Sequence, residues 1–125
     1  MKSRKFSIKK RLLSFVFAFN GLKILLKEEH NARIHLMVAL CAILVGIILR
    51  INTYEWIAII FVIGFVFAME ILNAAMENIA DFLSTDIDER IKKIKDLAAA
   101  ATLMSATVAL ITGLIIFLPK IIALI

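Results

Sequence analysis

The sequence predicts an all-α integral membrane protein, with an N-terminal amphipathic surface helix followed by three membrane-spanning helices. Of its 125 residues, 62% are hydrophobic, and the mean hydropathy is +0.97. An ordinary soluble domain has roughly 45–50% apolar residues, and so short a chain cannot bury this excess in one core. The same apolar content excludes a disordered chain, and the single Cys41 excludes a disulfide scaffold.

The N-terminal segment carries most of the positive charge, with nine of the fifteen Lys and Arg residues inside residues 1–33. Residues 8–27 place basic side chains at both ends of an apolar stretch, which is typical of a helix lying in the membrane interface. A cleaved signal peptide is the alternative, but no small-residue cleavage pattern follows the apolar run. Basic residues gathered at one end favour anionic lipid headgroups, and not nucleic acid, as the partner.

Three apolar segments follow, and we expect membrane spans at about residues 31–50, 54–82 and 96–118. Each is long enough to cross a hydrocarbon core of about 30 Å. Residues 84–96 are expected to form the one sizeable soluble loop. Thirteen of the fifteen basic residues then lie on one side of the membrane, so the positive-inside rule predicts a cytoplasmic N-terminus. The length of the chain leaves room for one domain, so we expect a single membrane domain over residues 1–125.

The second span contains polar residues that an apolar helix does not need, namely Glu70, Asn73, Glu77 and Asp81. At 100° per residue all four fall within a stripe of about 80° on one helix face. A charge at mid-membrane costs about 2.5–3.5 kcal/mol on insertion scales, so it normally faces a bundle interior or a water-filled site. Capping and solvation of the helix end is the alternative interpretation, above all for Asp81.

Two further polar clusters, residues 27–35 and 92–96, are expected at the same cytoplasmic level. In the first cluster, Glu29 and Arg33 have the i,i+4 spacing of a helical ion pair. Carboxylates from two helices, an amide and a lysine suit a divalent metal with a nucleotide polyphosphate. The sequence has no P-loop, so a nucleotide would be held by other means.

Zinc is not expected, because His30 and His35 do not share a helix face and no second Cys is present.

Residues 70–81, E-I-L-N-A-A-M-E-N-I-A-D, closely resemble the signature of the bacterial diacylglycerol kinase and undecaprenol kinase family, E-x-[LIVM]-N-[ST]-[SA]-x-E-x-x-[VT]-D. Residues 19–22, 29–33 and 95–96 resemble further family landmarks in the same order. Ala74 and Ala80 depart from the signature, and every acidic and amide position is kept. These kinases are small membrane proteins, and the resemblance covers nearly the whole chain.

The resemblance implies a homotrimer with active sites between subunits, in the bacterial cytoplasmic (inner) membrane, with the site on the cytoplasmic side. It implies ATP-dependent, Mg²⁺-dependent phosphorylation of diacylglycerol to phosphatidic acid, with undecaprenol as the alternative acceptor. From a different class, the chain could be a non-catalytic membrane subunit in which Glu70 relays protons or pairs with a basic residue of a partner. That interpretation leaves Glu29 and Lys95 unexplained, and a lipid phosphatase is weaker still because paired histidines are lacking.

The resemblance also implies residue roles. Glu70 would be the catalytic base acting on the lipid hydroxyl, and Glu29 and Glu77 would bind the metal that bridges the ATP phosphates. The implied ATP-binding positions are Lys10, Phe17, Glu29, Asn73, Glu77, Asp86, Asp88, Lys95 and Asp96. The implied lipid-binding positions are Arg33, Trp56, Glu70 and Ala99. Lys10 and Phe17 stand where the best-known branch has Arg and Tyr, and the two loop aspartates match the family only by position.

Overall fold

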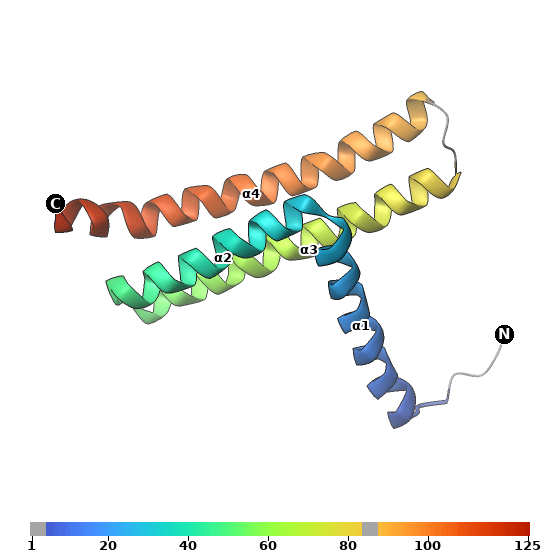
Figure 1. Ribbon diagram of the computed structural model, residues 1–125, viewed down its shortest axis with the longest axis horizontal. Helices are drawn as coiled ribbons and strands as arrows, with labels where there is room; N and C mark the ends of the chain where they lie inside the picture. Colours follow the sequence, from blue (N-terminus) through green and yellow to red (C-terminus); the bar gives the residue numbers. More distant parts are fainter. Residues whose placement is uncertain (1–4, 84–87) are drawn as a thin grey trace.

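A computed structural model describes residues 5–83 and 88–125, which form the helices α1 (Ile8–Glu28), α2 (His30–Leu49), α3 (Thr53–Leu83) and α4 (Glu89–Leu124). Helices α2, α3 and α4 lie side by side, and α1 leaves them at a steep angle from the end where α2 begins (Figure 1). Each of the three bundled helices is long and apolar enough to cross a membrane. The predicted fold class, an N-terminal helix followed by three apolar helices, is confirmed.

The junction between α1 and α2 is a single residue, Glu29, whose extended backbone interrupts the helix. Arg33 reaches back across this break, and its Nε donates to the carbonyl oxygen of Leu26 at 2.6 Å while its Nη2 donates to that of Lys27. The last carbonyls of a helix lack intrahelical partners, and a cation near them is stabilising. Arg33 therefore fixes the angle between α1 and α2.

The expected ion pair between Glu29 and Arg33 is wrong for the described residues. The i,i+4 rule holds only when both residues belong to one continuous helix. Here Glu29 is the non-helical cap of α2, and the guanidinium of Arg33 is directed to the carbonyls of α1 instead.

A tight turn joins α2 to α3 at the other end of the bundle. Arg50 ends α2 in the left-handed conformation, with φ of 54°. Asn52 and Glu55 then form a reciprocal capping box: the Glu55 N–H donates to Asn52 Oδ1 at 2.9 Å, and the Asn52 N–H donates to Glu55 Oε1 at 3.0 Å. Nζ of Lys120 in α4 lies 3.2 Å from Oε1 of the same glutamate. Glu55 of α3 therefore contacts both the turn and α4.

The core of this end of the bundle consists of Ile51, Ile59 and Ile116, with Trp56 packed against it. Gly46 of α2 permits this packing, because a Cβ there would lie only 2.9 Å from Cη2 of Trp56. Trp56 follows the turn and packs against α2 at Gly46. This packing therefore requires a glycine at position 46.

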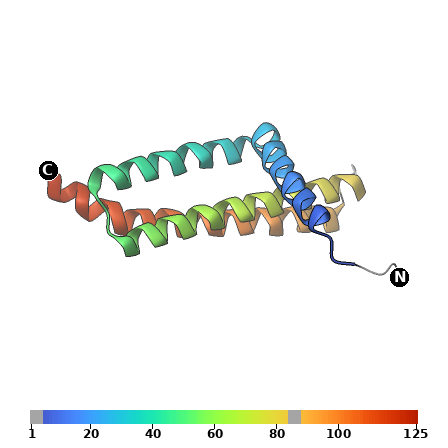
Figure 2. The same cartoon turned by 90° about the horizontal axis from the view of Figure 1, so that it is seen from below.

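Helices α3 and α4 pack together along most of their length and project beyond the start of α2 (Figures 1 and 2). Lys95 of α4 forms an ion pair with Asp81 of α3, with 2.5 Å between Nζ and Oδ1. The side chain of Asp88 caps α4 by accepting from the Arg90 N–H at 2.7 Å.

The expected soluble loop over residues 84–96 is too long, because α4 already begins at Glu89. The helix also continues through Pro119 to Leu124, past the point where the apolar run ends. Hydropathy marks the limits of the apolar segment, whereas the helix starts at its cap and continues while backbone bonds are available. A proline removes its own N–H and its ring crowds the carbonyl four residues earlier, yet α4 continues beyond Pro119 to Leu124.

Candidate functional site

The four polar residues of α3 lie along one face of a single continuous helix and differ in exposure. The Glu70 side chain is only 4% exposed, Asn73 and Glu77 are half-buried, and the Asp81 side chain is 62% exposed. Exposure therefore rises toward the end of α3 that projects beyond α2, where Asp81 is already paired with Lys95. The deepest carboxylate is the one without contact with bulk water.

The surroundings of Glu70 come from different parts of the chain. Its Oε1 lies 3.1 Å from Nε2 of His35, which is in the second turn of α2. The charges of Glu29, at the α1–α2 junction, and of Glu77, about two helical turns after Glu70 on α3, are close enough to act on the same carboxyl group. Glu70 is thus in contact with His35, and the charges of Glu29 and Glu77 act on its carboxyl group from the α1–α2 junction and from α3.

Sequence reasoning missed the contact between His35 and Glu70, since it tested His35 only as a zinc ligand. The signal that could have revealed this contact is the depth at which the two residues are expected in the membrane. The start of α2 and the polar face of α3 were both expected at the cytoplasmic level, and His35 is the one titratable residue early in the apolar part of α2.

Asn73 lies between the deeper and shallower carboxylates of α3 in the sequence. Its Oδ1 is buried and has no hydrogen-bond partner in the described part of the chain. A buried acceptor normally has a partner, so an unpaired one points to a missing group. A bound cation or a donor group of a ligand would satisfy it.

The oxygen atoms here are of the type that Mg²⁺ prefers. Mg²⁺ is commonly bound through one or two carboxylates, with substrate phosphates and water completing its shell. No group of three or more acidic, His or Cys side chains within residues 5–83 and 88–125 is arranged to hold a metal by itself. The carboxylates of Glu29 and Glu77 and the unpaired amide oxygen of Asn73 could each contribute an oxygen ligand, and a divalent ion here would need further ligands from outside the described residues.

The start of α4 contributes the basic part of the site. Lys95 contacts Asp81, and Lys92 contacts Asp96 at 2.6 Å, so both expected nucleotide positions are held in exposed ion pairs. The backbone N–H of Arg90 holds the pKa of the Asp88 carboxyl below its usual value, and the Arg90 side chain adds to this. Asp86, the other expected loop residue, lies outside the described residues.

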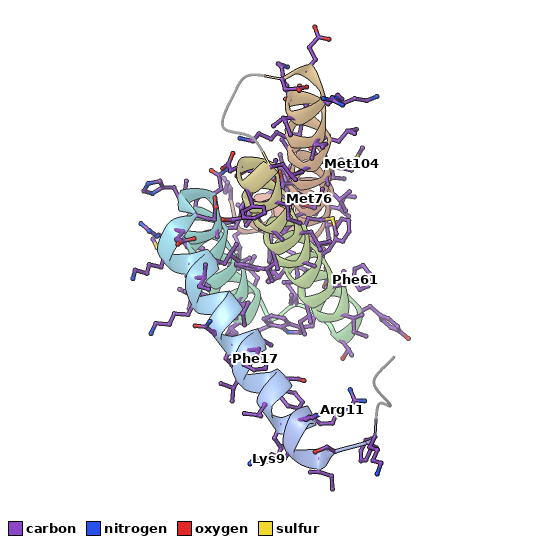
Figure 3. The ribbon with its side chains drawn as sticks, turned by 90° about the vertical axis from the view of Figure 1, so that its right-hand side faces the viewer. Lys9, Arg11, Phe17, Phe61, Met76 and Met104 are labelled. Atoms are coloured by element: carbon purple, nitrogen blue, oxygen red, sulfur yellow. The ribbon has the colours of Figure 1, made fainter. Side chains whose placement is uncertain are left out.

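Several expected site residues are not brought to the Glu70 cluster within one chain. Lys10 and Phe17 are exposed on α1, which extends away from the bundle (Figure 3). Trp56 precedes Glu70 by 14 residues on α3, a rise of about 21 Å, and packs at the opposite end of the bundle. Ala99 is exposed on α4.

An apolar groove of about 520 Å³ lies between α2, α3 and α4. Its walls are aliphatic and aromatic over almost their whole extent, with small residues such as Ala42, Ala109 and Gly113 on two of the helices. His35 is its one basic lining residue, and it belongs to the turn of α2 that contacts Glu70. The groove therefore runs from the turn-side core to the polar cluster.

Comparison with known proteins identifies the family. The model of the family described as prokaryotic diacylglycerol kinase matches residues 16–117. An undecaprenol kinase of Bacillus subtilis (strain 168) is 35% identical over 107 residues, which cover 86% of this chain and 87% of the relative. A diacylglycerol kinase of Synechocystis sp. is 29% identical over 90% of this chain and 65% of the relative. One from Helicobacter pylori (strain 26695) is 32% identical over 76% of this chain and 75% of the relative. With the three apolar helices and the polar cluster described above, these matches show that the chain belongs to the prokaryotic diacylglycerol kinase family.

Proposed function

We propose that the protein is an ATP-dependent lipid kinase that transfers the γ-phosphoryl group of ATP to the hydroxyl of a membrane lipid alcohol. The observation that carries this proposal is the buried carboxylate of Glu70, placed beside Glu29, Glu77 and an unpaired amide oxygen, next to the end of an apolar groove. Membership of the family and relatives named as kinases support it.

Phosphoryl transfer depends mainly on alignment and charge neutralisation, with little covalent chemistry for the protein to perform. Glu70 accepts the proton of the lipid hydroxyl as that oxygen attacks the γ-phosphorus and the bond to the β-phosphate oxygen breaks. Glu29, Glu77 and Asn73 would hold the Mg²⁺ of the nucleotide, and this ion would supply neutralisation of the phosphate charge. Lys95 and Asp96 orient the nucleotide from α4, and Asp88 approaches it from the N-cap of that helix. Asp86 is the remaining nucleotide-binding position that the family resemblance implies.

The lipid enters from the bilayer with its chain in the apolar groove and its hydroxyl at Glu70. An apolar groove that ends at a polar cluster matches the polarity of such an amphiphile. Arg33, Trp56 and Ala99 complete the lipid-binding positions that the family resemblance implies, with Trp56 contacting chain and not headgroup because it packs at the far end of the bundle.

Two acceptors belong to this proposal. Diacylglycerol, which would give phosphatidic acid, agrees with the description of the family. Undecaprenol, which would give undecaprenyl phosphate, agrees with the Bacillus subtilis relative, whose similarity extends over most of both chains. We now place undecaprenol first, because that relative exceeds the Synechocystis and Helicobacter pylori kinases in both identity and coverage of its own length.

The active form is proposed to be a homotrimer in the bacterial cytoplasmic membrane, with the N-terminus and the site facing the cytoplasm. Two observations support shared sites. Lys10 and Phe17 are far from the Glu70 of their own chain, so they would reach the nucleotide of a neighbouring subunit. The bundle also leaves many large apolar side chains exposed, and neighbouring subunits would cover part of this surface while lipid covers the rest. Chemical cross-linking in micelles tests the stoichiometry.

The activity is tested with purified protein in mixed micelles, supplied with Mg-ATP and either undecaprenol or diacylglycerol. Glu70→Gln should abolish phosphoryl transfer while nucleotide binding is retained, because the amide keeps the shape of the side chain and cannot accept the proton. Glu28→Gln is the matched control, since Glu28 is an exposed carboxylate on α1. Full activity of Glu70→Gln would reject Glu70 as the base. Absence of phosphorylated product from both lipids would reject the kinase proposal and favour a non-catalytic subunit.

A further inference from the structure

We propose that His35 is a positioning residue that holds the Glu70 carboxylate in its reactive orientation. The proposal deepens the proposed function, because it takes Glu70 to be the base. It starts from the 3.1 Å contact between Nε2 of His35 and Oε1 of Glu70, which joins two different helices, α2 and α3. Among the ion pairs of the described residues, this is the one that Glu70 makes.

The burial of Glu70 makes such a partner necessary. A buried carboxylate without a polar partner is costly, and a glutamate side chain has three rotatable bonds through which it can turn away. Glu29 and Glu77 act on the same carboxyl with like charge, and this repulsion tends to displace it. The imidazole Nε2 lies close enough to Oε1 to offset that repulsion when it carries a proton, and the contact leaves Oε2 for the proton of the substrate hydroxyl.

The position of His35 is itself well determined. It lies two residues after Arg33, whose hydrogen bonds to the carbonyls of Leu26 and Lys27 anchor the first turn of α2. On either side of it along α2, Ala32 and Ala39 are buried, with 0% and 7% of their surface exposed. Small residues let α2 approach its neighbours closely, so the imidazole is carried by an anchored helix and not by a loop.

The apolar groove indicates from which side the substrate hydroxyl approaches the contact between His35 and Glu70. His35 lines the apolar groove at its polar end, and the Glu70 carboxylate contacts His35 there. A lipid whose chain lies in this groove therefore brings its hydroxyl to the His35–Glu70 pair. The histidine turns the carboxylate toward that point, which is the alignment that phosphoryl transfer requires.

Three variants of His35 test this role. His35→Leu removes the N–H. His35→Gln places an amide N–H near the position of Nε2, whereas the shorter side chain of His35→Asn places it near Nδ1, out of reach of Glu70. His30→Leu is the matched control, because His30 is exposed in the first turn of the same helix. Steady-state kcat and the KM values for ATP and for undecaprenol or diacylglycerol are measured in mixed micelles.

We expect kcat to fall by roughly 10- to 100-fold in His35→Leu and His35→Asn, the order of magnitude for a misaligned catalytic group. The KM for ATP stays unchanged, and His35→Gln recovers most of kcat. If His35 had only a structural role, the Gln and Asn variants would have similar kcat values, and kcat would not change independently of the KM for ATP. Equal kcat in the Gln and Asn variants, or wild-type kcat in His35→Leu, overturns the proposal. If the wild-type protein phosphorylates neither lipid, it is the proposed function that fails, so the two failures are distinguishable.

Discussion

The close approach of Gly46 to Trp56 leads to a quantitative prediction about the packing of α2 against the turn into α3. In Gly46→Ala, the new Cβ would lie 2.9 Å from Cη2 of Trp56 and 3.1 Å from Cδ1 of Ile51. Carbon atoms attract best at about 3.5–4.0 Å, so the ring and the methyl group must each move by roughly half an ångström or more. Both belong to or adjoin the core at this end of the bundle, where Trp56 cannot shift independently.

Overpacking of this kind destabilises a protein by about 1–3 kcal/mol. Replacing a helical glycine by alanine also stabilises the helix by about 0.5–1 kcal/mol, which partly offsets the loss. Gly64→Ala provides the matched control, because Gly64 is in α3 and a Cβ there would meet nothing within 4 Å. The free energy of unfolding of the two variants should therefore differ by about 1–3 kcal/mol, which is the overpacking contribution alone.

The measurement is unfolding by sodium dodecyl sulfate in mixed micelles, followed by far-ultraviolet circular dichroism and by the fluorescence of Trp56, the single tryptophan. Gly46→Ala should unfold at a lower detergent fraction than Gly64→Ala, with a changed tryptophan emission before unfolding. If both variants unfold at the same fraction, α2 does not pack against Trp56 as closely as described, and the reasoning is refuted.

Three further predictions follow from other parts of the structure. The Asp88 carboxyl that caps α4 has a lowered pKa, so its stabilisation is complete above the usual Asp pKa of about 3.9 and is lost as the pH falls through the lower folded value. Amide protection in the first turn of α4, measured relative to the exchange rate of an unfolded chain at each pH, should fall in the same way, and in Asp88→Ala this acid-dependent loss of protection should be absent. Ala109→Phe, which fills the apolar groove, should raise the KM for lipid several-fold and leave the KM for ATP unchanged, and an unchanged lipid KM would remove the groove from substrate binding. Lys95→Met should raise the KM for ATP with little loss of stability, because its ion pair with Asp81 is exposed. An equal rise in Lys93→Met would show that loss of any positive charge near the start of α4 has this effect, and would contradict a specific role of Lys95.

Much of the candidate site could be predicted from the sequence. The alignment of Glu70, Asn73, Glu77 and Asp81 on one face follows from helical periodicity alone. Their exposure rises toward the end of α3, because that end projects beyond α2 (Figure 1). The alignment is a property local to one helix. The orphaned amide oxygen of Asn73 could not be predicted, because it depends on which groups from elsewhere fail to reach it.

The roles of Arg33 and His35 show where local rules stop being sufficient. The i,i+4 spacing of Glu29 and Arg33 predicts an ion pair, but a one-residue break in the helix redirects the guanidinium to the carbonyls of α1. The spacing of His35 from every acidic residue in the sequence gives no hint of its contact with Glu70, 35 positions later. That contact exists only because α2 and α3 pack as neighbours.

By itself, the sequence determined that this protein crosses a membrane with three helices, that its polar residues gather at one face, and that it resembles a family of small lipid kinases. Hydropathy, charge bias and helical periodicity are sums over neighbouring residues, so they can be read along the chain. Only the tertiary structure decided where α4 begins, how Arg33 anchors the junction with α1, why Gly46 has no side chain, and which histidine meets the buried Glu70. These depend on distances between helices, and such distances are set by packing of side chains that are far apart in the sequence.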